Sequence, residues 1–481
     1  MGDPASRREH RDPRGAQHRS GRIERGGGRR SAALLRVHRG SARHLRQTIQ
    51  GGDPPAVVSN TPRQQPLGRP FANLFSANLS SSLGDGIART AIPLLAVQIT
   101  LDPLLISGIA ALAMLPWLFF AIPAGILIDK VDRRMALAVA STVRTMLAVL
   151  LFVLTATGGL TIWWLYVVVF VYGMFETVYD GAIRAVVPSI LPKAALPRGN
   201  SLIEAGEQVV QNFVAGPFTS LLFVFSALIP LGANAAVYAL AAVLAFMLPQ
   251  VASGRQFARA HAKTSDETVP WHRQFRDGYR FIMARPQLRT LWFISTADGL
   301  AFSMATASLV LFIVDRLGLP EALFGVFMLT GAVGSIAASL LTPRITARWG
   351  MGLTVACANL ITAVSVAAIG VFPNLIVLTV GWIVVSAALT VWNVLIMSFR
   401  QSVIPGRLLG RVHGTWRTLL WGSMPVGSVL GGLLGRIDLA LPFIVGGVIS
   451  LFTALIWFRF FVSLPNPEDI DNGDEAALAA A

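Results

Sequence analysis

From residue 71 onward the chain alternates between long apolar runs and short polar or Gly/Pro-rich breaks. Each run is about 20 residues or longer, the length that an α-helix needs to cross ~30 Å of hydrocarbon. This pattern predicts an all-α membrane protein with twelve transmembrane helices. The expected spans are residues 71–98, 104–128, 135–156, 162–187, 200–226, 228–248, 289–314, 321–342, 351–371, 374–399, 410–434 and 438–462.

The longest polar interruption, residues 249–288, falls between the sixth and the seventh span. It divides the chain into an N-terminal six-helix half at 71–248 and a C-terminal six-helix half at 289–463, joined by a central loop. The halves echo each other, because basic residues follow the second and eighth spans and a proline follows the fourth and tenth. Parallel repeats of this kind are typical of alternating-access transporters with a midplane binding site.

Composition narrows the possible functions. Only 14% of the residues are charged and 54% are hydrophobic, whereas about a quarter of a soluble domain is charged. The single cysteine, Cys357, excludes a disulfide framework and any multi-cysteine metal site. The sequence contains no Walker A loop, HExxH pair or Gly-x-Ser-x-Gly elbow. We therefore expect neither an enzyme nor an ATP-driven pump, with no cofactor and no metal.

Basic residues gather in alternate loops. The loops on one side carry many of them, whereas those on the other side carry only Arg316 and Arg436. Since Lys and Arg accumulate on the cytoplasmic side of a bilayer, the basic loops and both termini are predicted to be cytoplasmic. The chain is thus expected to be a multi-pass protein of the inner membrane.

Residues 1–70 contain 15 arginines, no lysine and five acidic residues. They lack an apolar run, so we expect a disordered extension, as we do for the acidic tail at 464–481. Binding to nucleic acid is disfavoured because the extension has no Phe, Tyr or Trp for base stacking. It could instead lie on an anionic leaflet. The interpretation that we favour is a non-functional extension upstream of the true start.

The segment after the second span resembles the loop 2–3 signature of the major facilitator superfamily. It reads GILIDKVDRR, with Asp132 where the superfamily usually has Gly. The resemblance implies a twelve-helix fold in two halves and a gate in which the acid meets the start of span eleven. The implied gate residues are Gly125, Asp129, Lys130, Arg133 and Arg134.

Two further segments resemble one branch of this superfamily, which holds macrolide exporters and the enterobactin exporter. They are residues 82–87 in the first span and residues 271–291, with a short amphipathic helix before the seventh. In the fifth span, Gly216-Pro217 resembles the antiporter signature and is expected to pack helices. Thr219-Ser220 stand where that signature has paired glycines. The resemblance implies export of a drug, macrolide-like compound or siderophore by antiport.

Charged residues within the spans are costly and therefore mark candidate functional sites. Asp85 lies near the middle of the first span, and Arg89 is on the same helical face and able to pair with it. A carboxylate that alternates between a buried partner and water suits proton coupling. Glu176 in the fourth span and Asp298 in the seventh are further candidates. For each, a static charge network is the alternative.

In this superfamily, spans one, four, seven and ten line the substrate cavity. Aromatic and Met side chains suit bulky amphipathic ligands. The candidates are Phe175, Phe302, Met304, Trp392 and Asn393. We therefore expect proton-coupled efflux of a small amphipathic molecule by a monomer in the lipid bilayer. A lysophospholipid flippase and a transporter-like sensor without flux are the alternatives.

Overall fold

The computed structural model describes residues 67–253 and 271–466. The described residues form one structural unit, and all of its described secondary structure is helical, as predicted. The predicted extension and acidic tail lie almost wholly outside the described residues.

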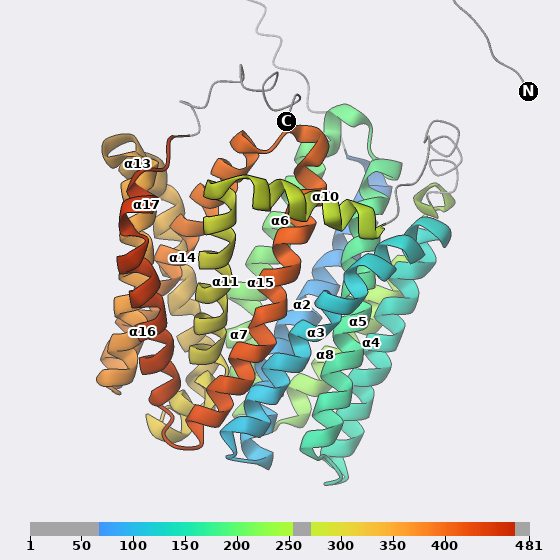
Figure 1. Cartoon of the computed structure of the whole chain (residues 1–481). Coiled ribbons are helices and arrows are strands. Elements are labelled where there is room, and N and C mark those ends of the chain that lie inside the picture. Colours follow the sequence, from blue (N-terminus) through green and yellow to red (C-terminus); the bar gives the residue numbers. More distant parts are fainter. Residues whose placement is uncertain (1–66, 254–270, 467–481) are drawn as a thin grey trace, which may run out of the picture. The chain divides into compact units, whose positions relative to one another are not determined.

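Helices of the N-terminal half follow the predicted spans closely (Figure 1). The fifth span is divided into three segments by a short π-helix, a feature that often reorients side chains near functional sites. The elements are α2 (Gly68–Ile99), α3 (Pro103–Lys130), α4 (Arg133–Ala156), α5 (Ile162–Ile190), η1 (Lys193–Ala195), α6 (Leu196–Val209), η2 (Val210–Val214), α7 (Ala215–Phe223), α8 (Leu228–Phe246) and η3 (Gln250–Ser253).

In the C-terminal half, the element α13 consists of two helices joined at a kink, which correspond to the eighth and the ninth predicted spans. The chain turns inside it at Gly350, where φ is 76° and ψ is 162°, a conformation that favours glycine. The elements are α10 (Trp271–Ala284), α11 (Pro286–Thr306), α12 (Leu309–Leu311), η4 (Phe312–Arg316), α13 (Glu321–Val371), α14 (Leu375–Val403), α15 (Gly406–Gly435), α16 (Leu441–Ile456) and α17 (Phe458–Val462).

Among the described residues, 7 helices are long and apolar enough to cross a membrane, or 8 if the bent pair Pro286–Thr306 and Leu309–Arg316 is one span. One of these helices is α13, which covers two predicted spans. The other predicted spans correspond to α2, to the segmented helix α6–η2–α7 and to the pair α16–α17. These helices are not counted among the 7 because polar residues or breaks interrupt their apolar runs.

Aspartates cap the N-termini of α3 and α4, each of which follows a short loop. Asp102 accepts a hydrogen bond from the Leu104 amide at the start of α3. Asp132 accepts from the amides of Arg134 and Met135 at the start of α4. An N-cap of this kind typically contributes about 1 kcal/mol. Helix capping therefore accounts for Asp132 at the position where the superfamily usually has glycine.

The two halves meet closely along α3 with α15 and along α7 with α13, as Figure 1 shows for α3 and α15. A Cβ atom at Gly325 would overlap the backbone of Gly216. The Gly325 amide also donates to Ser220 Oγ at 2.7 Å. Small residues allow such backbone approach between membrane helices. Gly216 thus lies at a contact between the halves, and Ser220, which replaces a signature glycine, supplies a hydrogen bond there.

Polar contacts join the halves at one end of the bundle. This end contains the loop between α2 and α3 and is the predicted outer end. Arg436 donates to Asp102 through two bonds, Nε to Oδ1 at 2.8 Å and Nη2 to Oδ2 at 2.6 Å. Gln98 Nε2 donates to Glu321 Oε2 at 2.9 Å. An apolar core containing residues of both halves lies at the same end. These contacts close the bundle there.

The bidentate pair predicts a pH-dependent closure. Hydrogen bonding from Arg436 holds the pKa of Asp102 below its usual range. A lowered pKa means that the pair stabilises the closed end above the pKa of an unpaired aspartate, about 3.9, and that this is lost as the pH falls through the lowered pKa. Asp102→Asn should therefore favour opening of the predicted outer end at neutral pH. We expect the population of the open form to rise by roughly two- to fivefold, a small factor because the pair is partly exposed.

Opening can be measured as the labelling rate of one cysteine by an impermeant maleimide added from outside. The reporter is Ala113→Cys, a position on the cavity between the halves, in a Cys357→Ser background. The matched control is Asp438→Asn, because its partner Arg316, at 3.6 Å, lies in the same half. An equal rise in both variants, or none in Asp102→Asn, would contradict the inter-half role of Asp102.

Candidate functional site

A cavity of about 480 Å³ lies between the halves, bounded by α2, α3 and α5 on one side and α15 on the other. Its wall includes an aromatic pair that joins the halves, Trp117 and Trp421, with ring centroids 5.3 Å apart in an edge-on arrangement. The guanidinium of Arg417 lies 4.3 Å from the Trp421 ring. The cavity therefore combines aromatic surface with a nearby cation.

An ion pair also lines this cavity. Arg89 Nη2 donates to Glu176 Oε1 at 2.9 Å, and Arg89 Nη1 donates to Gln211 Oε1 at 3.2 Å. The Arg89 side chain is 60% exposed, whereas that of Glu176 is 12% exposed. The pair connects α2, α5 and η2, and its arginine is able to rearrange within the cavity.

Behind this wall lies a second ion pair that the cavity does not expose. Arg144, which is 0% exposed, donates from Nη1 to Asp85 Oδ1 at 2.7 Å. The hydroxyls of Tyr172 and Tyr238 donate to the same oxygen at 2.6 and 2.8 Å. Arg144 also donates to Ser81. Charge-assisted bonds of this kind offset the cost of burying both charges.

Aromatic rings enclose the Arg144 guanidinium, whose carbon lies 4.7 Å from the Tyr179 centroid and 4.8 Å from that of Tyr238. The expected pairing of Asp85 with Arg89 is therefore wrong. Helical spacing placed the two residues on one face correctly, but α4 supplies a closer base for Asp85 and α5 supplies an acid for Arg89.

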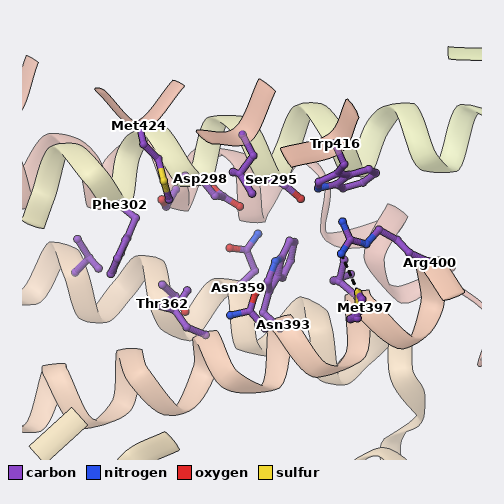
Figure 2. Close-up of a pocket in the computed structure, with 17 residues that line it drawn as sticks. Ser295, Asp298, Phe302, Asn359, Thr362, Asn393, Met397, Arg400, Trp416 and Met424 are labelled. Atoms are coloured by element: carbon purple, nitrogen blue, oxygen red, sulfur yellow. Dashed lines mark hydrogen bonds between the residues drawn. The ribbon is translucent and has the colours of Figure 1, made fainter. Parts of the chain in front are cut away.

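A separate cavity of about 280 Å³ lies within the C-terminal half, among α11, α13, α14, α15 and α16 (Figure 2). Four of the predicted residues line it, namely Asp298, Phe302, Trp392 and Asn393. Asp298 Oδ1 accepts from the Thr453 hydroxyl at 2.7 Å. The predicted candidates of the C-terminal half thus line a cavity of one half and not the cavity between the halves.

Two predicted cavity residues are placed elsewhere. Met304 is 3% exposed, and its backbone packs against Gly431 of α15. Phe175 packs against the apolar core of the N-terminal half. Neither lines the cavities described above. Sequence position identified the correct helices but not the face that each helix turns toward a cavity.

Comparison with known proteins assigns the family. The sequence model described as "Transmembrane secretion effector" matches residues 63–479. The chain belongs to this family of the major facilitator superfamily. Members of this superfamily are transporters and not enzymes, so the expectation of a membrane transporter is confirmed.

The curated relatives are distant. The chain is 24% identical over 403 residues to the "Multidrug efflux pump Tap" of Mycolicibacterium fortuitum, covering 80% of this chain and 95% of the relative. It is 25% identical over 410 residues to the protein of the same name from Mycobacterium tuberculosis (strain ATCC 25618 / H37Rv), covering 81% and 94%.

Solved structures share the fold. The nucleoside transporter NupG is 14% identical, with a TM-score of 0.63, and the match covers 82% of this chain and 100% of that one. A bacterial homologue of the iron transporter ferroportin in an inward-facing state is 15% identical, with a TM-score of 0.65 and coverage of 82% and 99%. At these identities the matches establish the major facilitator fold alone.

The gate signature of this superfamily is partly described. Arg133 Nη1 donates to the Ala185 carbonyl at 2.8 Å, and Arg134 Nη1 donates to the Leu248 carbonyl at 2.9 Å. The two arginines thus tie the start of α4 to the ends of α5 and α8. The side chains of Asp129 and Lys130 and the surroundings of Gly125 are not described, so the gating role of these residues stays a prediction.

Several important residues were not predicted from the sequence. Trp117, Tyr172 and Trp421 line the inter-half cavity, and aromatic residues in apolar helices carry no signal of their own. Arg144 did carry a signal, as a base within a span. The chain has only five tyrosines, and three of them surround Arg144, but this clustering becomes visible only when the helices are packed.

Asp85→Asn should destabilise the protein, because it leaves the Arg144 charge buried without its carboxylate. Removing one partner of a buried pair costs about 3 kcal/mol or more of unfolding free energy. Unfolding in mild detergent measures this loss. The double variant Asp85→Asn with Arg144→Gln should recover part of it, because no charge is then left unpaired.

The matched control is Glu176→Gln, whose partner Arg89 is 60% exposed and can be solvated. Its loss of stability should be much smaller. If Asp85→Asn and Glu176→Gln unfold at the same temperature as the wild type, Asp85 does not stabilise the bundle through Arg144.

Proposed function

We propose that the protein exports bulky amphipathic compounds through the inter-half cavity in exchange for protons. The observation that carries this proposal is the Arg89–Glu176 pair on the wall of a cavity that both halves bound. The name of the Tap relatives supports efflux of drug-like compounds as the direction and substrate class.

The lining suits such substrates. Trp117, Trp421 and Met114 provide broad, polarizable apolar surface, and Pro93 and Ile92 extend it. The Arg89–Glu176 pair is the polar element of this surface. A cavity of about 480 Å³ falls within the range of small-molecule sites. Aromatic and Met side chains recognise shape loosely, which favours a range of compounds over one.

Glu176 is the residue to which we assign proton exchange. It lines the cavity and its cationic partner is exposed, so a proton on the carboxylate would release Arg89 toward water or substrate. Asp85, by contrast, is 4% exposed and holds Arg144. Tyr172 connects the two sites, since its ring lines the cavity and its hydroxyl donates to Asp85. In this proposal Asp85 positions the wall that carries Glu176.

Asp298 takes no part in this path, because it lines the separate cavity of the C-terminal half. We also propose the orientation given by the basic loops, with both termini cytoplasmic. In this orientation the closed end faces outward, so the inter-half cavity is reached from the cytoplasm, where an exporter binds its substrate.

Efflux of ethidium, a fluorescent amphipathic cation, into everted membrane vesicles tests the proposal under an imposed pH gradient. Wild-type transport should fall at least about tenfold when the gradient is collapsed. Glu176→Gln should lose the gradient-driven component to a similar extent, because an amide cannot release a proton.

The matched control is Asp315→Asn, which neutralises an exposed carboxylate on η4, away from both cavities. It should transport as the wild type does. Wild-type flux that ignores the gradient would remove the antiport claim, and full gradient-driven flux in Glu176→Gln would remove the role of that residue.

A further inference from the structure

The cavity of the C-terminal half is built differently from the inter-half cavity. All of its lining residues come from α11, α13, α14, α15 and α16 of one half (Figure 2). Its volume is about 280 Å³. It therefore has no need of the opposing half to be complete, and substrate passage between the halves does not explain it.

Buried polar atoms without partners surround this cavity. They include Ser295 Oγ and Arg400 Nε, which have no hydrogen-bond partner within the described residues, and they lie beside Asp298, which interacts with the side chains of Thr453, Asn359 and Ser450. Leaving such groups unsatisfied is costly, and native interiors rarely do so without a function. The lining residues carry both donors and acceptors, which suits a polar ligand that offers both kinds in return.

Two of these residues are charged and are not paired with each other or with another side chain of opposite charge in the described ranges. Asp298 has neutral neighbours, among them the Thr453 hydroxyl that donates to Oδ1. Arg400 Nη2 donates to the Met397 sulfur at 3.1 Å, and its guanidinium lies 4.8 Å from the Trp416 ring centroid. A thioether is a weak acceptor, so the guanidinium keeps its capacity to bind an anion.

The two charges lie at different depths along the cavity. Arg400 stacks on Trp416, whose carbonyl accepts from Trp292 Nε1 at 3.2 Å. Leu420, one helical turn beyond Trp416, packs against Gly299, the neighbour of Asp298. Asp298 therefore lies at another level of the cavity than Arg400. Figure 2 shows Asp298 and Asn359 between Arg400 at one end and Phe302 with Met424 at the other.

We propose that this cavity binds a small zwitterion of the amino-acid type with an apolar side chain. Its ammonium group pairs with the Asp298 carboxylate, and its carboxylate binds the Arg400 guanidinium. The amide of Asn359 adds a polar contact, and the apolar body lies against Phe302, Trp392 and Met424. A ligand with both charges fits best because it gives each of these partly buried side chains an opposite charge, which neither has among the described residues.

Three probes with the same body test the charge requirement. They are L-phenylalanine, which carries both charges, L-phenylalanine amide, which keeps only the cation, and N-acetyl-L-phenylalanine, which keeps only the anion. Each is added to the purified full-length protein, and binding is measured by thermal stabilisation and by calorimetry. L-phenylalanine should bind at least about tenfold more tightly than either derivative, because each derivative loses one charge-assisted contact.

Asp298→Asn and Arg400→Gln should each weaken L-phenylalanine binding by about tenfold or more. In addition, Asp298→Asn should reduce the advantage of L-phenylalanine over its N-acetyl derivative, and Arg400→Gln its advantage over the amide. Unfolding of each variant without probe shows whether it is folded. These pairwise losses of selectivity would not arise from a merely structural defect.

Asp315→Asn is the matched control, since it neutralises an exposed carboxylate that lines neither cavity and should leave L-phenylalanine binding unchanged. The measurement needs no gradient, so its outcome is independent of the proposed antiport. The proposal is overturned if L-phenylalanine does not bind, if a singly charged probe binds equally well, or if neither Asp298→Asn nor Arg400→Gln weakens binding.

Discussion

The burial of Arg144 is the constraint around which the N-terminal half is arranged. A guanidinium with no exposed surface in an apolar bundle requires a carboxylate, further acceptors and aromatic faces, and these come from neighbouring helices. Asp85 and Ser81 of α2 and the tyrosines of α5 and α8 meet this need. The ring of Tyr238 lies so close to α2 that only glycine fits at position 84. The ion pair thus sets how closely these helices pack.

Because Asp85 is committed to Arg144, Arg89 is left to face the cavity and to pair with Glu176. One ion pair is therefore enclosed and the other is accessible, although Asp85 and Arg89 lie one turn apart on the same helix. This separation would allow the accessible Arg89–Glu176 pair to change its protonation while the enclosed Asp85–Arg144 pair keeps the helices packed. The Tyr172 side chain belongs to both environments, because it lines the cavity and donates a hydrogen bond to Asp85.

The C-terminal half lacks such an enclosed pair among its described residues and has a cavity with separated, unpaired charges in its interior. The two halves therefore differ in how their buried polar groups are satisfied. They are held together by small residues in backbone contact and, at the predicted outer end, by Arg436 on Asp102. Close contact of small residues combined with exposed polar bonds gives an interface that is tight but reversible.

The sequence alone predicted an all-helical membrane protein and the approximate bounds of many of its helices, since the length of an apolar run is a property of the chain in one dimension. It also identified the carboxylates of interest, because a charge in an apolar run is conspicuous. It could not determine that Asp85 would pair with Arg144, or that Phe302 and Trp392 would line a cavity of one half. Those outcomes depend on the rotation and packing of helices that are distant in sequence, where a shift of one position along a helix turns a side chain by about 100°. Only the tertiary structure therefore decided which buried charges are satisfied and which face a cavity.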